Sequence, residues 1–215
     1  FNNRIYGLTK GQYSPTSEQG KVTYSTPMGS LDYPFNPSKL VLGAEGGFVA
    51  KTIDRELKHL QEMIKRANEY NGASFIEIYQ NCNIFNDGAF SELTDKETKS
   101  EKLLRIENGK PMIFGPTDNK GIYLDGTTPK VVDIGKKYSI DDILVHNEQD
   151  KFISDMLSNF TANDVFPEPI GVLYCKERAT YNDLMEEQMK EAKKKDKSKK
   201  TLNDLLNAGD TWEVK

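Results

Sequence analysis

Gly47-Phe-Val-Ala50 is a short apolar segment of the kind that forms a buried strand. An amphipathic stretch from Asp54 to Tyr70 follows it, with Asp54 as a plausible helix N-cap and Asn71-Gly72 as a stop signal. Its apolar stripe is formed by Ile53, Leu57, Leu60, Ile64 and Ala67. The β-branched and aromatic segment Ala73-Ser-Phe-Ile-Glu-Ile-Tyr79 then predicts a second strand. Strand, helix and strand with short connections predict a parallel βαβ unit, and therefore an α/β fold with a mostly parallel sheet.

The rest of the chain adds shorter elements to this unit. Residues 103–133 alternate short apolar runs with turn residues, which predicts a hairpin or meander. Further helices are expected at 40–44, 150–160, 181–192 and 202–206, and a further strand at 170–175. Residues 13–38 are rich in proline, glycine and serine, which predicts a long loop.

Composition restricts the class of protein. The chain has 215 residues, 36% hydrophobic residues, a mean hydropathy of −0.67 and a formal charge of −4, so nothing points to a nucleic-acid partner. We find no apolar run long enough to span a membrane and no signal peptide. Two cysteines, Cys82 and Cys175, do not make a disulfide scaffold, and the cytoplasm is the expected compartment.

The amino-terminal residues form the most distinctive motif. Asn2-Asn3 precedes a glycine-containing loop, Gly7-Leu-Thr-Lys-Gly11. A carboxamide oxygen is a suitable ligand for Mg²⁺, and backbone groups of such a loop can reach phosphate oxygens. In parallel sheets ligands bind beyond the carboxyl ends of the strands, so we expect Asn3 and Cys82 to share one edge of the fold. The alternative is an ordinary turn with no ligand.

The segment Asn2-Asn-Arg-Ile-Tyr-Gly-Leu-Thr-Lys-Gly-Gln-Tyr-Ser-Pro-Thr-Ser17 resembles the thiamine-diphosphate loop of the beta subunits of 2-oxoacid:ferredoxin oxidoreductases, and is most similar to the 2-oxoglutarate type. Weaker matches follow in the same order: Ser25-Thr-Pro-Met-Gly29, Pro34-Phe-Asn-Pro37, Gln80-Asn-Cys82, Ile84-Phe-Asn-Asp87, Pro169-Ile-Gly-Val172 and Gly209-Asp-Thr-Trp212. The chain has no initiator methionine, and we expect it to be the carboxyl-terminal portion of such a subunit.

The resemblance implies specific roles for the loop. Asn3 would give its side-chain oxygen, and Ile5 its carbonyl oxygen, to Mg²⁺. Three loop residues would line the diphosphate and thiazolium end of thiamine diphosphate: Gly7, Leu8 and Thr9. The family's other Mg²⁺ ligand is an aspartate in an upstream Gly-Asp-Gly motif, which this sequence does not contain.

Lys10 is the residue that we expect to contact the substrate. A lysine ammonium is suited to a carboxylate, and 2-oxoglutarate has a distal carboxylate that pyruvate lacks. A site built round that charge would reject pyruvate, because the lysine would be left desolvated and unpaired. The alternative is a solvated loop lysine.

The resemblance also implies that Cys82 is one ligand of a 4Fe-4S cluster, whose other three cysteines belong to the upstream portion of the family's subunit. From the residues alone, a cysteine after a strand is more often a small buried hydrophobe. Cys175 is interpreted as part of a core strand, and His59 and His146 as structural residues.

The implied function is that of a beta subunit of 2-oxoglutarate:ferredoxin oxidoreductase, which converts 2-oxoglutarate and coenzyme A to succinyl-CoA and CO₂ and passes electrons to ferredoxin. Its partner would be the alpha subunit, and the chain by itself is expected to be inactive. We expect residues 1–90 to belong to the thiamine-diphosphate domain and residues 91–215 to pack on it, with 190–200 as a mobile lysine-rich segment. Two alternatives stay open: a pyruvate or broad 2-oxoacid enzyme, and a non-catalytic α/β binding or assembly module.

Overall fold

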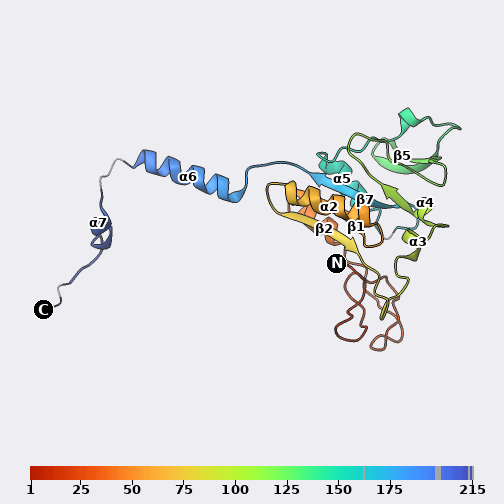
Figure 1. The fold of residues 1–215 in the computed structure, drawn as a ribbon, viewed down its shortest axis with the longest axis horizontal. Coiled ribbons are helices and arrows are strands. Elements are labelled where there is room, and N and C mark those ends of the chain that lie inside the picture. Colours follow the sequence, from red (N-terminus) through yellow and green to blue (C-terminus); the bar gives the residue numbers. More distant parts are fainter. Residues whose placement is uncertain (162, 197–199, 213, 215) are drawn as a thin grey trace. The chain divides into compact units, whose positions relative to one another are not determined.

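A four-stranded sheet forms the centre of residues 1–178 in the computed structural model, which describes residues 1–161, 163–196, 200–212 and 214 (Figure 1). The strand order is β2-β1-β7-β3. The strands are β1 (Phe48–Ile53), β2 (Ser74–Tyr79), β3 (Leu103–Arg105) and β7 (Glu168–Cys175). The β1–β2 and β3–β7 pairs are parallel and the β1–β7 pair is antiparallel. The predicted α/β fold with a mostly parallel sheet is therefore confirmed.

The βαβ unit is present with shifted boundaries. Helix α2 spans Leu57–Glu69, and Glu56 rather than Asp54 lies at its N-cap, without a side-chain cap. Asp54 instead accepts a hydrogen bond at 3.0 Å from the backbone N–H of Asn81. Ile53, which was predicted to lie in the helical stripe, is the last residue of β1 and is fully buried. The prediction of an Asp54 cap was wrong because this carboxylate stabilises the turn after β2.

Both faces of the sheet are covered, which explains why all six residues of β1 are buried. Phe48 and Ala50 pack with Met63 of α2 on one face. Val49 packs on the other face with Leu42 of α1 (Pro37–Gly43) and Leu157 of α5 (Lys151–Ser158). Alternation along β1 therefore sends successive side chains into two separate apolar layers.

The predicted meander is confirmed as a three-stranded antiparallel sheet in the order β4-β5-β6. Its strands are β4 (Ile113–Phe114), β5 (Lys120–Asp125) and β6 (Thr128–Asp133). Short helices α3 (Ser91–Thr94) and α4 (Lys99–Lys102) precede it, and a 3₁₀ turn, Ile140–Asp142, follows it.

The second unit, residues 179–215, contains helices α6 (Tyr181–Lys195) and α7 (Leu202–Leu206). Helix α6 runs three residues beyond its predicted end, and Glu191 pairs with Lys195 at 3.7 Å one turn away. Of the predicted mobile segment 190–200, residues 197–199 lie outside the described residues. Because β7 lies between β1 and β3, residues on both sides of position 90 build one sheet, and the boundary at that position stays a prediction.

Across the described parts of the chain, no helix is both long enough and apolar enough to cross a membrane.

The chain's two histidines are held by uncharged partners. The Nδ1 atom of His59 lies 2.8 Å from the hydroxyl of Thr52. The Nε2 atom of His146 lies 2.8 Å from the carbonyl oxygen of Val172, so Nε2 carries the proton and Nδ1 is left without a partner among the described residues. Burial is the main cause that lowers the pKa of both histidines below the ordinary value.

These lowered pKa values predict a pH-dependent stability. The unfolded chain binds protons at its histidines near pH ~6.5, whereas the folded chain does so only at lower pH. The free energy of unfolding should therefore be constant above pH ~6.5 and fall as the pH drops toward ~5, by at most about 1.4 kcal/mol per pH unit for each histidine. Urea denaturation across this range measures the slope. His146→Gln and His59→Gln should each flatten it, and an unchanged slope in either variant would contradict this account.

Candidate functional site

The amino-terminal segment is attached to the carboxyl end of β2. The backbone N–H of Asn2 donates to the carbonyl of Ile78 at 2.8 Å, and Gln80 donates to the carbonyl of Asn2 at 3.0 Å. Asn2 therefore lies beside Tyr79 in a parallel bridge. Figure 1 shows the loops of the first 35 residues, in red and brown, extending beyond this end of the sheet. Asn3 thus lies at the edge where the sequence predicted a ligand site.

Residues 6–12 form a tight closed loop. Tyr6 donates to the carbonyl of Gln12 at 2.8 Å, and Gly11 donates to the carbonyl of Tyr6 at 2.9 Å. Lys10 donates to the carbonyl of Gly7 at 3.0 Å. Lys10 and Gly11 both have left-handed backbone angles, with φ of 75° and 96°. A left-handed residue reverses the chain here, which closes the loop within seven residues.

Three consecutive backbone N–H groups in this loop are free as far as the described residues show. Those of Gly7, Leu8 and Thr9 have no acceptor within the described chain. Leu8 and Thr9 are exposed and Gly7 is half-buried. Consecutive unpaired N–H groups in a turn form a concave anion site, so the loop has the donors that a phosphate group requires.

The two asparagines at the start of the loop differ in their availability. Both polar atoms of the Asn2 side chain are engaged: Nδ2 donates to Glu77 at 2.7 Å, and Oδ1 accepts from Thr16 at 2.7 Å and from the N–H of Arg4 at 3.2 Å. Asn3 Oδ1 accepts only a long bond, 3.3 Å, from the N–H of Ile5. The carbonyl oxygen of Ile5 has no donor within the described chain. Asn3 and Ile5 therefore each have an oxygen available for a hard cation such as Mg²⁺.

Cys82 lies beside this loop. A Cβ atom built on Gly7 would lie 3.9 Å from Cys82 Sγ and 3.5 Å from the ring of Phe85. Asn86 joins the two segments, because its Nδ2 donates to the carbonyl of Asn3 at 2.9 Å and its backbone N–H donates to the carbonyl of Cys82 at 2.9 Å. The structure thus brings the predicted loop residues and the predicted thiol together.

Cys175, in contrast, lies at the other end of the sheet. It pairs with Phe48, the first residue of β1, whereas the loop adjoins Tyr79, which pairs with the last residue of β1. Both cysteines are free thiols. The described residues contain no cluster of three or more histidine, cysteine or acidic side chains that could hold a metal ion by itself.

A groove of about 640 Å³ runs along the loop and contains Lys10. A second lysine, Lys21, lines the same groove, together with the apolar side chains of Ile5 and Phe85. Lys21 Nζ donates to Glu18 at 2.9 Å and to Asn86 Oδ1 at 2.5 Å. Lys21 was not predicted from the sequence, because a lysine in a turn-rich segment carries no distinguishing signal.

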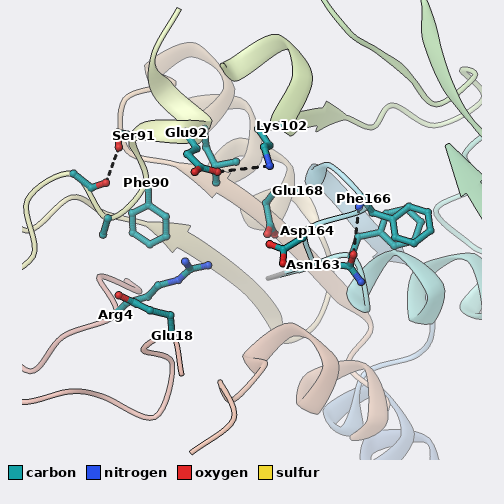
Figure 2. A pocket seen from close by; sticks show the side chains of 14 residues that line it. Arg4, Glu18, Phe90, Ser91, Glu92, Lys102, Asn163, Asp164, Phe166 and Glu168 are labelled. Atoms are coloured by element: carbon teal, nitrogen blue, oxygen red, sulfur yellow. Dashed lines mark hydrogen bonds and ion pairs between the residues drawn. The ribbon is translucent and has the colours of Figure 1, made fainter. Parts of the chain in front are cut away.

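A separate pocket of about 460 Å³ is lined by Arg4, Phe90 and Glu168, among others (Figure 2). Figure 2 shows the guanidinium of Arg4 extended into this pocket, beside Phe90. Its central carbon lies 4.8 Å from the Phe90 ring centroid and 5.3 Å from that of Tyr79. These cation–π contacts hold the Arg4 side chain against the two rings, and the backbone of Arg4 has a left-handed φ of 52°. No sequence signal indicated this role for Arg4.

Comparison with known proteins finds one family match and several relatives. Residues 1–78 match the family described as thiamine pyrophosphate enzyme, C-terminal TPP binding domain. The chain is 42% identical to the 2-oxoglutarate oxidoreductase subunit KorB of Mycobacterium tuberculosis, over all of this chain and 58% of that protein. It is 40% identical to the 2-oxoacid:ferredoxin oxidoreductase subunit beta of Saccharolobus solfataricus, over 54% of this chain and 38% of that protein.

A solved structure has the same fold. The 2-oxoglutarate:ferredoxin oxidoreductase from Magnetococcus marinus, with 2-oxoglutarate, coenzyme A and succinyl-CoA bound, matches 97% of this chain and 56% of its own chain. The TM-score is 0.66 and the sequence identity is 22%. The chain thus spans less than two thirds of the length of these relatives.

The loop geometry predicts different responses at its two glycines. Gly11→Ala should lower the free energy of unfolding by about 1–2 kcal/mol, because alanine disfavours a positive φ. Its Cβ would also lie 3.1 Å from the ring of Phe85. Gly7→Ala should change stability by less than about 0.5 kcal/mol, since its Cβ makes only ordinary contacts. Chemical denaturation of both variants measures the difference, and equal losses would show that the loop is not held as described.

Proposed function

Because the chain belongs to the family of 2-oxoacid:ferredoxin oxidoreductase beta subunits, we propose that it serves in the oxidative decarboxylation of 2-oxoglutarate. The products would be succinyl-CoA and CO₂, with electrons passed to ferredoxin. The identity of 42% with a 2-oxoglutarate oxidoreductase subunit over the whole of this chain supports this choice of substrate. The single observation that carries the proposal is the closed loop of residues 6–12, with its free N–H groups beside two available oxygens.

The loop fits the cofactor that the family implies. Asn3 Oδ1 and the carbonyl of Ile5 would hold Mg²⁺, and the N–H groups of Gly7, Leu8 and Thr9 would bind the diphosphate. When bound, thiamine diphosphate supplies the carbanion chemistry of decarboxylation. The contribution of this chain is to position the diphosphate through backbone groups that are already fixed by the loop.

Lys10 would bind the distal carboxylate of 2-oxoglutarate. It is exposed at the rim of the groove and has no ion pair among the described residues, so its ammonium is available. The proposed selectivity over pyruvate comes from the cost of leaving this charge unpaired when the substrate closes the groove. Lys21 would add positive potential, although Glu18 compensates part of its charge.

Cys82 would provide one thiolate to a 4Fe-4S cluster. Such a cluster needs four protein ligands, and Cys175 is too far along the sheet to be a second one. The remaining three would therefore come from outside this chain. A cluster held at Cys82 would lie next to Gly7, close to where the loop binds the cofactor, which shortens the path of the electrons.

The partner would be the alpha subunit of the same enzyme. Five large apolar side chains between residues 22 and 33 are at least 64% exposed: Val22, Tyr24, Met28, Leu31 and Tyr33. Two of them, Val22 and Tyr24, line the groove. Large apolar side chains that are exposed in one segment are typical of a subunit interface. The two free thiols fit a reducing compartment, and we propose the cytoplasm.

Lys10→Ala in the assembled enzyme should lower kcat/KM for 2-oxoglutarate by about 10- to 100-fold, the range for loss of a hydrogen bond to a charged group. Turnover of pyruvate, which lacks the distal carboxylate, should change by less than about threefold. Steady-state kinetics on both substrates measures the ratio. Lys65→Ala, which removes an exposed lysine from α2, is the matched control. Equal losses on both substrates would remove Lys10 from the substrate site.

Cys82→Ala should abolish the cluster, whereas Cys175→Ala should retain it. Alanine removes the thiolate but adds no bulk, so the fold of the 82–86 turn should persist. Iron content and the EPR signal of the reduced enzyme measure occupancy, and circular dichroism checks the fold. A full cluster in the Cys82 variant would rule out its role as a ligand.

A further inference from the structure

Lys51 is a charged residue in the middle of the sheet. It lies in β1 with no solvent exposure. Burial alone would lower its pKa, but the carboxylates of Glu168 and Glu77 together with Tyr79 outweigh burial and raise that pKa above the ordinary value. Lys51 is therefore a permanent positive charge inside the protein.

Oxygen atoms from three separate segments surround this ammonium. Its Nζ donates to Glu168 at 2.8 Å, to Thr161 at 2.5 Å and to the hydroxyl of Tyr79 at 3.4 Å. The hydroxyl of Tyr79 in turn donates to Glu168 at 3.2 Å. The Glu168 carboxylate thus accepts from two buried groups, Lys51 and Tyr79.

Glu77 has the other carboxylate near Lys51, and it contacts the amino-terminal segment at Asn2. Its Oε2 lies 3.7 Å from Lys51 Nζ and accepts from Ser38 at 2.7 Å. Its Oε1 accepts from Asn2 Nδ2 at 2.7 Å. Only 4% of Glu77 is exposed. This buried carboxylate contacts the amino-terminal segment through Asn2.

A carboxylate can only accept hydrogen bonds, and this fixes the orientation of the Asn2 amide. Nδ2 must face Glu77. Oδ1 must therefore point to the opposite side, where it accepts from the hydroxyl of Thr16 and from the N–H of Arg4. A flipped amide would place two acceptors together at Glu77 and an N–H group opposite the N–H of Arg4. The charge on Glu77 thus selects one of two amide orientations.

We propose that Glu77 is a positioning residue for the cofactor loop: it orients Asn2, and Asn2 sets the place of Asn3 and of the loop that follows. The cofactor part of this inference rests on the proposed function. The part that concerns how Glu77 holds the loop in place does not rest on the proposed function, because it follows from the contacts of Asn2 alone.

The size-matched variant Glu77→Gln tests the inference. A glutamine can present either an acceptor or a donor to Asn2, so the amide loses its preferred orientation while the volume is unchanged. Asn2→Asp should have the same effect, because it places two carboxylates together. The double variant, Asn2→Asp with Glu77→Gln, restores the hydrogen bond with the donor on the opposite side. The carboxylate that it places at position 2 can still accept from Thr16 and from the N–H of Arg4.

The rate of amide hydrogen exchange in the assembled enzyme without cofactor measures how firmly the loop is held in place. In each single variant the bonded amides of Arg4, Tyr6 and Gly11 should exchange on the order of ten- to a hundredfold faster, and in the double variant they should return to within about threefold of the parent. The dissociation constant of Mg–thiamine diphosphate, from fluorescence titration, should rise in the single variants and recover in the double variant.

Glu148→Gln is the matched control, because it removes the charge from another largely buried carboxylate, which pairs with Arg66 at 2.8 Å away from the loop. It should lower thermal stability without changing exchange in the loop. Unchanged exchange in Glu77→Gln, or no recovery in the double variant, overturns the inference. Faster exchange with recovery but a constant cofactor affinity supports the hold of Glu77 on the loop, and overturns instead the cofactor role proposed for Asn3.

Discussion

The packing of the central sheet depends on one buried ammonium, that of Lys51, which must be surrounded by oxygen atoms. Lys51 satisfies this requirement with groups from β2, from β7 and from the turn after α5, so these segments must meet on one face of β1. A charge without access to water is costly when it is unpaired, and loss of any one of these contacts would affect the others. One of the carboxylates that balance this charge also binds Asn2. Packing of the sheet and placement of the amino-terminal loop are therefore parts of the same network.

Local patterns predicted most of the secondary structure because the periodicity of apolar residues reports which face of an element is buried. The helix of residues 57–69, the strand ending at Tyr79 and the meander follow from such patterns. The same reasoning ended the first strand at Ala50, where the apolar run stops, whereas β1 continues to Ile53. Lys51 lies inside because Glu168, 117 positions away, compensates its charge, and no local pattern contains that information.

The candidate site was predictable to the extent that it is contiguous in sequence. The loop of residues 6–12 is closed by its own backbone bonds and follows directly on Asn3 and Ile5, so the residue types of this short segment were sufficient to indicate it. The contacts that tie it to the rest of the chain were not predictable, because each joins residues that are far apart. Asn86 beneath Asn3, Lys21 in the groove and Arg4 against Phe90 are examples. The family resemblance singled out Cys82, which does lie beside the loop, and it included Asn86 in a matching segment without giving that residue a role.

The left-handed backbone of Lys10 has an evolutionary consequence. A lysine at φ 75° is strained by roughly 1–2 kcal/mol relative to glycine, and its exposed side chain gains no packing energy that would offset this cost. Selection for thermal robustness alone would therefore replace it with glycine or asparagine. In its proposed role, the lysine ammonium would offset this loss of loop stability through what it binds, so position 10 would balance durability against substrate choice.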